Sequence, residues 1–159
     1  MKNKCIRLWL KFLYIGYSCF CFLFRPRVRG AYVLVTVVDR FLIIKNSYKK
    51  GWTLPCGMVD RRESEVEGAK RELKEETGID CETKDLAFLK EYLSTKSFKK
   101  DHQFFFHLKL QKMPTVTLDM TEVIDHRWIS VEELDASDLP DGVRFIISEF
   151  KDFIFSSYS

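Results

Sequence analysis

The stretch from Gly57 to Ile79, GMVDRRESEVEGAKRELKEETGI, constrains the fold most strongly because it contains a helix with both its start and stop signals. Ser64 can cap the first turn of this helix, and Gly78 is a natural stop signal. Four small or apolar residues recur at helical spacing and form one buried stripe: Val66, Ala69, Leu73 and Thr77. The sequence therefore predicts an amphipathic helix over residues 64–77.

Three glutamates of the predicted helix, Glu72, Glu75 and Glu76, stand at positions i, i+3 and i+4 and so share a face. Like charges at this spacing destabilise a helix unless a positive charge lies among them. Arg71 and Lys74 could be the counterions of a solvated acidic face, which is the interpretation that this run favours on its own. A bound cation is the alternative, and a site with only oxygen ligands selects hard cations such as Mg²⁺ or Mn²⁺.

The wider spacing reverses that preference. The fixed residues are Gly57, Glu63 after five residues, Arg71-Glu72-Leu73 after seven more, Glu75-Glu76 after one, and Gly78-Ile79 after one. This pattern resembles the Nudix (MutT-like) hydrolase box, G-x5-E-x7-R-E-U-x-E-E-x-G-U, in which U is apolar. At ordinary residue frequencies, a chance match is on the order of one in a million or less.

The resemblance extends over about Gly30 to Phe155. Trp52-x-Leu54-Pro55-x-Gly57 is similar to the family's approach to the box, and Glu122-x5-Trp128-Ile129-Ser130 to a segment that often follows it. Cys56 departs from the pattern, because many members have glycine there. A small residue in this turn is expected to leave the loop intact.

The resemblance implies roles for individual residues. It makes three glutamates the ligands of Mg²⁺, for which Mn²⁺ could substitute: Glu72, Glu75 and Glu76. Glu63 and Arg71 would hold the loop and the helix together by ion pairing, and Gly57 would permit a tight loop. The proposed catalytic set is Glu72, Glu76, Arg71 and Glu63. Within the box, Glu76 or Glu72 is the favoured general base.

Further candidates lie outside the box. Glu122 is the best candidate for an additional base or metal ligand, because it begins a predicted strand near the expected site. Asp101 and His102 are weaker candidates. Three aromatic residues could contact a substrate, although aromatic strands are more often core: Tyr48, Trp52 and Phe104.

The implied reaction is attack by water on a phosphorus of a diphosphate bridge, in a nucleoside diphosphate linked to another group. A nucleotide sugar, a dinucleotide and a nucleoside triphosphate all remain candidates, because the downstream marks of known subgroups are not evident. The alternative is a catalytically silent module that senses nucleotides and is tethered to a membrane, although the intact box favours catalysis. No specific nucleic acid partner is predicted.

The first 29 residues differ in charge from the rest of the chain. They carry seven basic residues and no acid, whereas residues 30–159 carry 19 basic and 23 acidic residues. Residues 12–24 lack charge, but a helix of this length spans roughly 20 Å, less than the roughly 30 Å hydrocarbon core of a bilayer. Residues 6–24 could therefore form a helix that packs on the body, a membrane-surface helix or a marginal span. Pro26 ends any such helix by Arg25.

The remaining pattern predicts an α/β fold. We expect a strand from Gly30, a turn at Asp39-Arg40 and a second strand, then a short strand at Trp52–Leu54 and a turn at Pro55-Cys56-Gly57. Later segments predict strands over 85–93 and 103–110, a strand ending at Ile129, a helical turn over 131–134 and a closing helix over 141–155. The resemblance implies an α/β/α sandwich with a mixed β-sheet over residues 30–159, after a basic apolar leader at 1–29.

Five cysteines at irregular spacing predict reduced thiols: Cys5, Cys19, Cys21, Cys56 and Cys81. Reduced thiols favour a cytoplasmic location, which would be peripheral or anchored at the inner membrane face if the leader binds lipid. The oligomeric state is left open, with a homodimer as one alternative.

Overall fold

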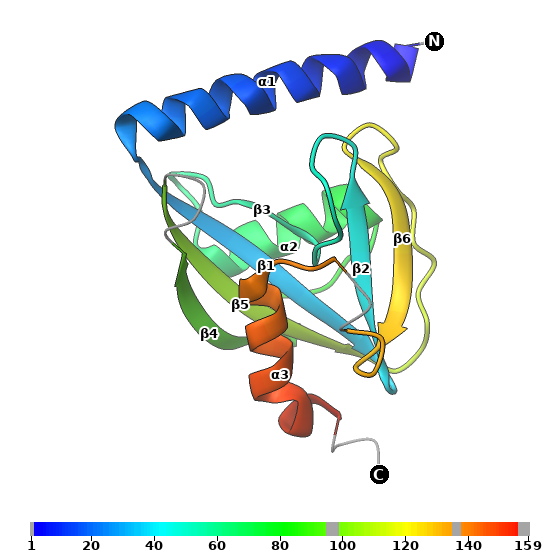
Figure 1. Ribbon diagram of the computed structural model, residues 1–159. Helices are drawn as coiled ribbons and strands as arrows, with labels where there is room; N and C mark the ends of the chain where they lie inside the picture. The colour runs from blue at the N-terminus through cyan, green and yellow to red at the C-terminus, as the bar shows by residue number, and fades with distance from the viewer. Residues whose placement is uncertain (1, 95–98, 135–137, 156–159) are drawn as a thin grey trace.

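The computed structural model describes residues 2–94, 99–134 and 138–155, in which a mixed sheet carries a helix on each face (Figure 1). The helices and strands are α1 (Lys2–Phe24), β1 (Arg27–Val37), β2 (Arg40–Asn46), β3 (Cys56–Met58), α2 (Glu65–Thr77), the 3₁₀ helix η1 (Thr83–Asp85), β4 (Leu86–Ser94), β5 (Lys100–Leu110), β6 (Val123–Ser130) and α3 (Asp141–Phe155). The sheet order is β4-β5-β1-β2-β6, and β3 pairs with β1.

The centre of the sheet is the parallel pair of β1 and β5, which runs in unbroken register from Arg27 opposite Lys100 to Val37 opposite Leu110. The other strand pairs are antiparallel, so the sheet is mixed. A two-residue turn at Val38 and Asp39 joins β1 to β2. Because β1 is covered on both faces, its sequence is a nearly continuous apolar run.

Two separate cores lie on the two faces of the sheet. Ala69 and Leu73 of α2 pack with Val33 of β1 on one face. Val143 and Ile146 of α3 pack on the other face, with residues such as Leu34 of β1. This alternation of adjacent β1 residues between the two cores follows from the two-residue period of a strand. The arrangement confirms the predicted α/β/α sandwich.

Helix α2 begins and ends where the sequence predicts. Ser64 is its N-cap and forms a capping box with Glu67, in which the Ser64 N–H donates to Glu67 Oε2 at 2.8 Å. Gly78 ends the helix at φ 71°, in the left-handed region that glycine tolerates best, and its N–H donates to the Lys74 carbonyl at 2.9 Å. Local signals are therefore sufficient to define this element.

Several predictions of turns and strands differ from the structure. Cys56 and Gly57, expected in a turn, belong to β3, where Gly57 pairs with Ala31. The expected strand at Trp52–Leu54 is reduced to an isolated bridge between Thr53 and Ile44. The central strands also begin earlier than expected, β1 at Arg27 and β5 at Lys100, because each completes the other's hydrogen bonds.

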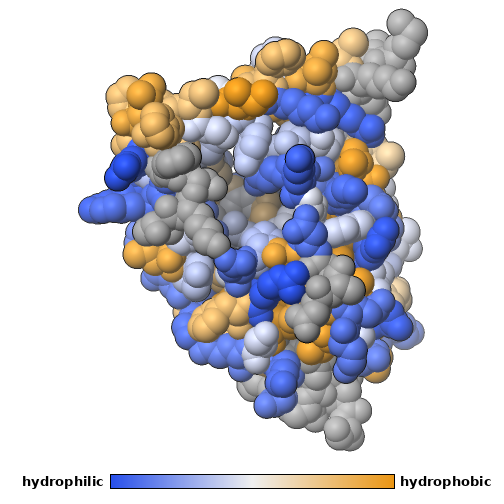
Figure 2. Space-filling view, viewed as in Figure 1, coloured by the Kyte–Doolittle hydropathy of each residue, from blue (hydrophilic) through white to orange (hydrophobic). Residues whose placement is uncertain are grey.

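Helix α1 lies across one end of the sheet (Figure 1). Tyr17 Oη lies 3.9 Å from Met58 Sδ, and Arg7 Nη2 donates to the Met120 carbonyl at 2.8 Å, so one face of α1 contacts the body. The helix also presents a row of hydrophobic residues to solvent (Figure 2). Its segment Cys5–Phe24 has a mean hydropathy of 1.4 and meets the length and composition of a membrane span.

Candidate active site

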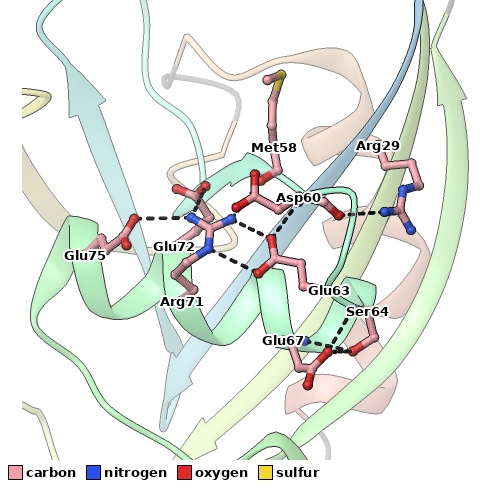
Figure 3. Close-up of polar contacts among 9 residues, drawn as sticks. All are labelled: Arg29, Met58, Asp60, Glu63, Ser64, Glu67, Arg71, Glu72 and Glu75. Carbon is pink, nitrogen blue, oxygen red and sulfur yellow. Dashed lines mark hydrogen bonds and ion pairs between the residues drawn. The ribbon is translucent and has the colours of Figure 1, made fainter.

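Arg71 connects the loop before α2 to the acidic face of the helix (Figure 3). Its guanidinium binds Glu63 through two bonds, Nη2–Oε1 at 2.6 Å and Nε–Oε2 at 3.2 Å. Nη2 also donates to the Met58 carbonyl at 2.9 Å. Nη1 donates to Glu72 Oε1 at 2.7 Å and to Glu75 Oε2 at 3.2 Å. One planar cation therefore joins β3, the loop and the helix, a geometry that suits arginine and not lysine.

The loop is further fixed at both ends. The Asp60 N–H donates to Glu63 Oε1 at 2.7 Å, and the hydrogen bond from Arg71 lowers the pKa of the Glu63 carboxyl. Arg29 of β1 donates to the Asp60 carbonyl at 2.8 Å and forms an ion pair with Glu65, also at 2.8 Å. The two residues thus form an ion pair, as the resemblance implies, and their supporting role stays a prediction.

Gly57 is required by a close approach and not by a tight loop. A Cβ atom at this position would lie 2.0 Å from Glu72 Cδ and 2.2 Å from both carboxylate oxygens. Gly57 lies within β3, and among the described glycines only Gly51 and Gly78 have positive φ. The glycine therefore makes space for the Glu72 carboxylate, and the expected need for a tight loop at this position is wrong.

Glu76 is the most deeply buried of the three glutamates, at 5% exposure. Its Oε2 accepts the Cys56 N–H at 2.8 Å, and its Oε1 accepts a bond from Asn46 Nδ2 at 3.4 Å. Burial raises the pKa of Glu76 to about 8. Burial also raises the pKa of the Cys56 thiol to about 12, so this thiol is neutral. Cys56 thus binds Glu76 through its backbone N–H and not through its side chain, which is consistent with the expected tolerance of a small residue there.

The glutamates fit a hard divalent cation by their donor chemistry and by their charge. The side chains of Glu75, Glu72 and Glu76 form a series from solvent to interior, with 61% exposure for Glu75 and 17% for Glu72. Burial raises the pKa of Glu72, as it does for Glu76, so this region favours added positive charge. Within the described ranges, no three acidic, histidine or cysteine side chains converge as a ready metal cluster. A cation here would share Glu72 and Glu75 with Arg71.

A cavity of about 600 Å³ lies between α1 and the body, beside the acidic residues. Figure 2 shows a hollow beneath the hydrophobic row of α1. Tyr48 and Glu122 line this cavity. Burial raises the pKa of the Glu122 carboxyl, and nearby Asp119 and Glu75 raise it further. Glu122, which immediately precedes β6, is therefore close enough to the glutamates of α2 to share their electrostatic field.

The two other aromatic candidates lie elsewhere. Trp52 lines a second cavity, where the Arg127 guanidinium lies 4.5 Å from the centre of its ring. Phe104 packs against the core beneath α2, while the next residue, Phe105, packs beneath α3. The structure therefore supports Tyr48 alone of the three as a residue lining the main cavity.

Among the weaker candidates, Asp101 lines the cavity and is 5% exposed, with Lys99 Nζ 3.0 Å from its carboxylate. His102 instead contacts Glu91, with Nδ1 2.5 Å from Oε1. Asn46, whose side chain bonds to Glu76, was not predicted from the sequence. The available signal was its position as a polar residue at the end of an apolar strand. Tyr14 and Tyr17 of α1 were not predicted either, because the leader carried no signal of a role at the site.

Comparisons with known proteins show the family of the chain. The family model described as the NUDIX domain matches residues 25–150. Phosphatase NudJ of Escherichia coli K12 is 32% identical over 121 residues, which cover 74% of this chain and 77% of NudJ. Nudix hydrolase 6 of Arabidopsis thaliana is 30% identical over 118 residues, 65% of this chain, and the match spans 38% of the plant protein.

A solved structure has the same fold. The MutT protein of Methanosarcina mazei Go1 superimposes with a TM-score of 0.71 at 26% identity, over 82% of this chain and 96% of that protein. The match to the family model covers most of the chain, and it includes the loop, helix and strands that carry the site. On this combined basis, the chain belongs to the Nudix family of hydrolases.

Proposed function

We propose that this protein is a metal-dependent hydrolase of a diphosphate bond in a nucleoside diphosphate linked to a second group. The second group would be a sugar, another nucleotide or a further phosphate. The observation that carries the proposal is the organised acidic face of α2, where Arg71 binds Glu63, Glu72 and Glu75 beside a cavity. NudJ, a relative, is named a phosphatase, which agrees with a phosphate-ester or anhydride substrate.

Glu72, Glu75 and Glu76 are the residues that would hold Mg²⁺, or Mn²⁺ in its place. The ion would neutralise phosphate oxygens and lower the pKa of a coordinated water. Arg71 and Glu63 position the carboxylates through the contacts described above. Within the box, Glu72 or Glu76 would accept the proton of the attacking water. Glu122 is the alternative acceptor, because it lines the cavity and because burial and nearby acids raise its pKa, which makes it a stronger base.

The test is a hydrolysis panel of ADP-ribose, dinucleoside polyphosphates, nucleotide sugars and nucleoside triphosphates, with and without Mg²⁺. Wild type is compared with Glu75→Gln and with Glu67→Gln. The second variant is a matched control, because Glu67 lies on the same helix and glutamine can replace it in the capping box. We expect Mg²⁺-dependent release of phosphate or nucleotide from wild type and Glu67→Gln, and loss of at least about 100-fold in Glu75→Gln.

Two results would contradict this proposal. Absence of metal-dependent release from every compound would reject the hydrolase function, and tight nucleotide binding without release would instead support the silent sensor. Equal activity of Glu75→Gln and wild type would remove Glu75 from the ligand set. Glu122→Gln separates the two assignments of the base, since a role for Glu122 predicts a fall in kcat with little change in KM.

We also propose that residues 6–24 attach the protein to a membrane surface on its cytoplasmic side. Three large side chains on α1 are highly exposed: Trp9 at 63%, Phe12 at 64% and Leu23 at 71%. Basic residues precede and follow them in the chain, and the opposite face of α1 contacts the body. This arrangement favours a helix lying in the membrane interface over one that spans the bilayer.

Co-sedimentation with vesicles tests the membrane proposal. We expect the full chain to bind vesicles containing phosphatidylglycerol, and the protein lacking residues 1–25 to stay in solution. Equal partitioning of the two proteins would reject the anchor. Sedimentation velocity of the same samples decides between a monomer and a homodimer.

A further inference from the structure

The main cavity has a wall that is not part of the Nudix domain. The family match begins at residue 25, whereas α1 ends at Phe24. Six residues of α1 nevertheless line the cavity: Leu10, Leu13, Tyr14, Tyr17, Ser18 and Cys21. Their spacing of three or four residues places them on one face of the helix. A substrate in this cavity would therefore touch the leader as well as the family domain.

Three contacts hold this face of α1 over the segments that surround the acidic residues. The Tyr14 ring lies 5.7 Å from the Tyr48 ring, between centroids. Tyr17 Oη reaches Met58 Sδ at 3.9 Å, and the Met58 carbonyl in turn accepts a bond from Arg71. Arg7 binds the carbonyl of Met120, two residues before Glu122, as described above. These contacts fix α1 against segments that also line the cavity, at Tyr48 and Met58, or that lie next to Glu122.

The lining of the cavity combines aromatic side chains from both α1 and the body with a few polar groups. Tyr14 and Tyr17 of α1 face a body surface that includes Tyr48. Asp101 and Gln103 also line the cavity, and Gln103 Nε2 donates to Asp101 Oδ2 at 3.1 Å. Ligand sites commonly combine such apolar walls with a few polar groups that fix orientation. Aromatic walls with an amide and a carboxylate suit a flat ring that has hydrogen-bonding groups at its edge.

We propose that α1 is a wall of the substrate site, with Tyr14 and Tyr17 as specificity-determining residues that contact a planar heterocycle such as a nucleobase. This proposal rests on the proposed function, because the diphosphate would lie toward Glu122 and the glutamates of α2. The leader thus recognises the heterocycle of the substrate, which does not take part in the reaction. A linear hydrocarbon group would use only the apolar walls, whereas a heterocycle could also bond to the polar atoms of Asp101 and Gln103 that line the cavity.

The test compares variants of α1 on three substrates. Tyr14→Ala and Tyr17→Ala remove rings from the cavity, and Tyr14→Phe keeps the ring. Phe88→Ala is the matched control, because Phe88 is a similarly exposed aromatic residue, at 57%, that does not line the cavity. The substrates are a nucleoside triphosphate, inorganic tripolyphosphate, which has no ring, and farnesyl diphosphate, which has an alkyl chain in place of the ring.

We expect Tyr14→Ala and Tyr17→Ala to raise KM for the nucleotide by about 5-fold to 100-fold, the range produced by loss of one base-stacking ring. kcat should change little, and hydrolysis of tripolyphosphate should not change. Tyr14→Phe and Phe88→Ala should behave as wild type. The urea midpoint of each variant, compared with wild type, shows whether the fold is retained.

The proposal is overturned if both alanine variants hydrolyse the nucleotide like wild type, or if they impair tripolyphosphate to the same degree. Preference for farnesyl diphosphate, with a KM that responds to Tyr14→Ala, would overturn the heterocycle and assign the cavity to an alkyl chain. If no compound is hydrolysed, the proposed function fails independently. Calorimetric titration with AMP then tests this inference, which requires weaker binding of AMP to Tyr14→Ala than to Phe88→Ala.

Discussion

Gly57→Ala tests whether the glycine of β3 exists to make room for Glu72. The new Cβ would lie 2.0 Å from Glu72 Cδ. An ordinary contact between carbon atoms is about 3.5 Å or more, so the carboxylate must move by roughly 1.5 Å. That movement breaks the 2.7 Å contact between Glu72 and Arg71. The backbone itself tolerates alanine, because Gly57 is not among the residues with positive φ.

The expected effect on stability is small, and the effect on activity is large. Loss of the contact between Arg71 and Glu72 costs about 1 kcal/mol. The gain from replacing a flexible glycine is about 0.4 to 1 kcal/mol, so the net change in the free energy of unfolding is close to zero. Hydrolysis should nevertheless fall by about 100-fold, because a displacement of this size moves a proposed metal ligand out of position.

A double-mutant cycle with Glu72→Ala isolates the cause. When the carboxylate is absent, Gly57→Ala has nothing to displace and should stabilise the protein by about 0.4 to 1 kcal/mol. The coupling between the two sites, measured by urea denaturation, should therefore be about 1 kcal/mol. Gly16→Ala is the control, because nothing lies within 4 Å of a Cβ at that position. Zero coupling, or unchanged hydrolysis by Gly57→Ala, would refute the close-approach argument.

Three further predictions concern stability. Arg71→Lys should lower the free energy of unfolding in urea by about 1 to 2 kcal/mol, because lysine cannot form the paired bonds to Glu63. Arg62→Lys is the control at an exposed arginine and should be neutral, so an equal loss of stability in both variants would contradict the prediction. Burial lowers the pKa of His107 to about 4, so the neutral form stabilises the fold fully above pH 6.5 and about 3 kcal/mol is lost as the pH falls from 6.5 to 4. His107→Gln keeps a hydrogen-bond partner for the Thr36 hydroxyl, which lies 2.8 Å from the imidazole. Urea titrations at several pH values should show that this variant loses less stability between pH 6.5 and 4 than wild type, and an equal loss in both would reject the prediction. Val38→Gly should raise the thermal unfolding midpoint and increase the free energy of unfolding by about 0.5 to 1 kcal/mol, because exposed Val38 has a φ of 54° in the β1–β2 turn. A lower midpoint would show that the valine is not strained.

The parts of the fold that depend on local signals could be predicted from sequence. Helix α2 has its cap at Ser64 and its stop at Gly78, and α3 matches the predicted range 141–155. Strand β3 could not be predicted, because a three-residue strand is defined by its distant partner β1. The chain around Cys56 contains turn-forming residues, and tertiary pairing overrides that preference.

The candidate site divides in the same way. The spacing of Glu63, Arg71 and the glutamates of α2 was sufficient to bring them together, because they lie on one helix and the loop that precedes it. The direction of an aromatic side chain in a strand depends on register, which the sequence FFF at 104–106 does not reveal. Phe104 and Phe105 therefore lie in different cores. The wall supplied by α1 depends on long-range docking, for which the leader's composition gives no signal.

The docking of α1 also has a consequence for synthesis of the chain. Tyr17 can contact Met58 only after 41 more residues have been synthesised, and Arg7 can contact Met120 only after 113 more. At about 5 to 20 residues per second, the second interval lasts roughly 6 to 23 s. During that time, a helix rich in Phe and Leu lacks the surface that it contacts in the finished protein. In the nascent chain, α1 is therefore accessible to chaperones and lipid before the body that forms the rest of the cavity has been synthesised.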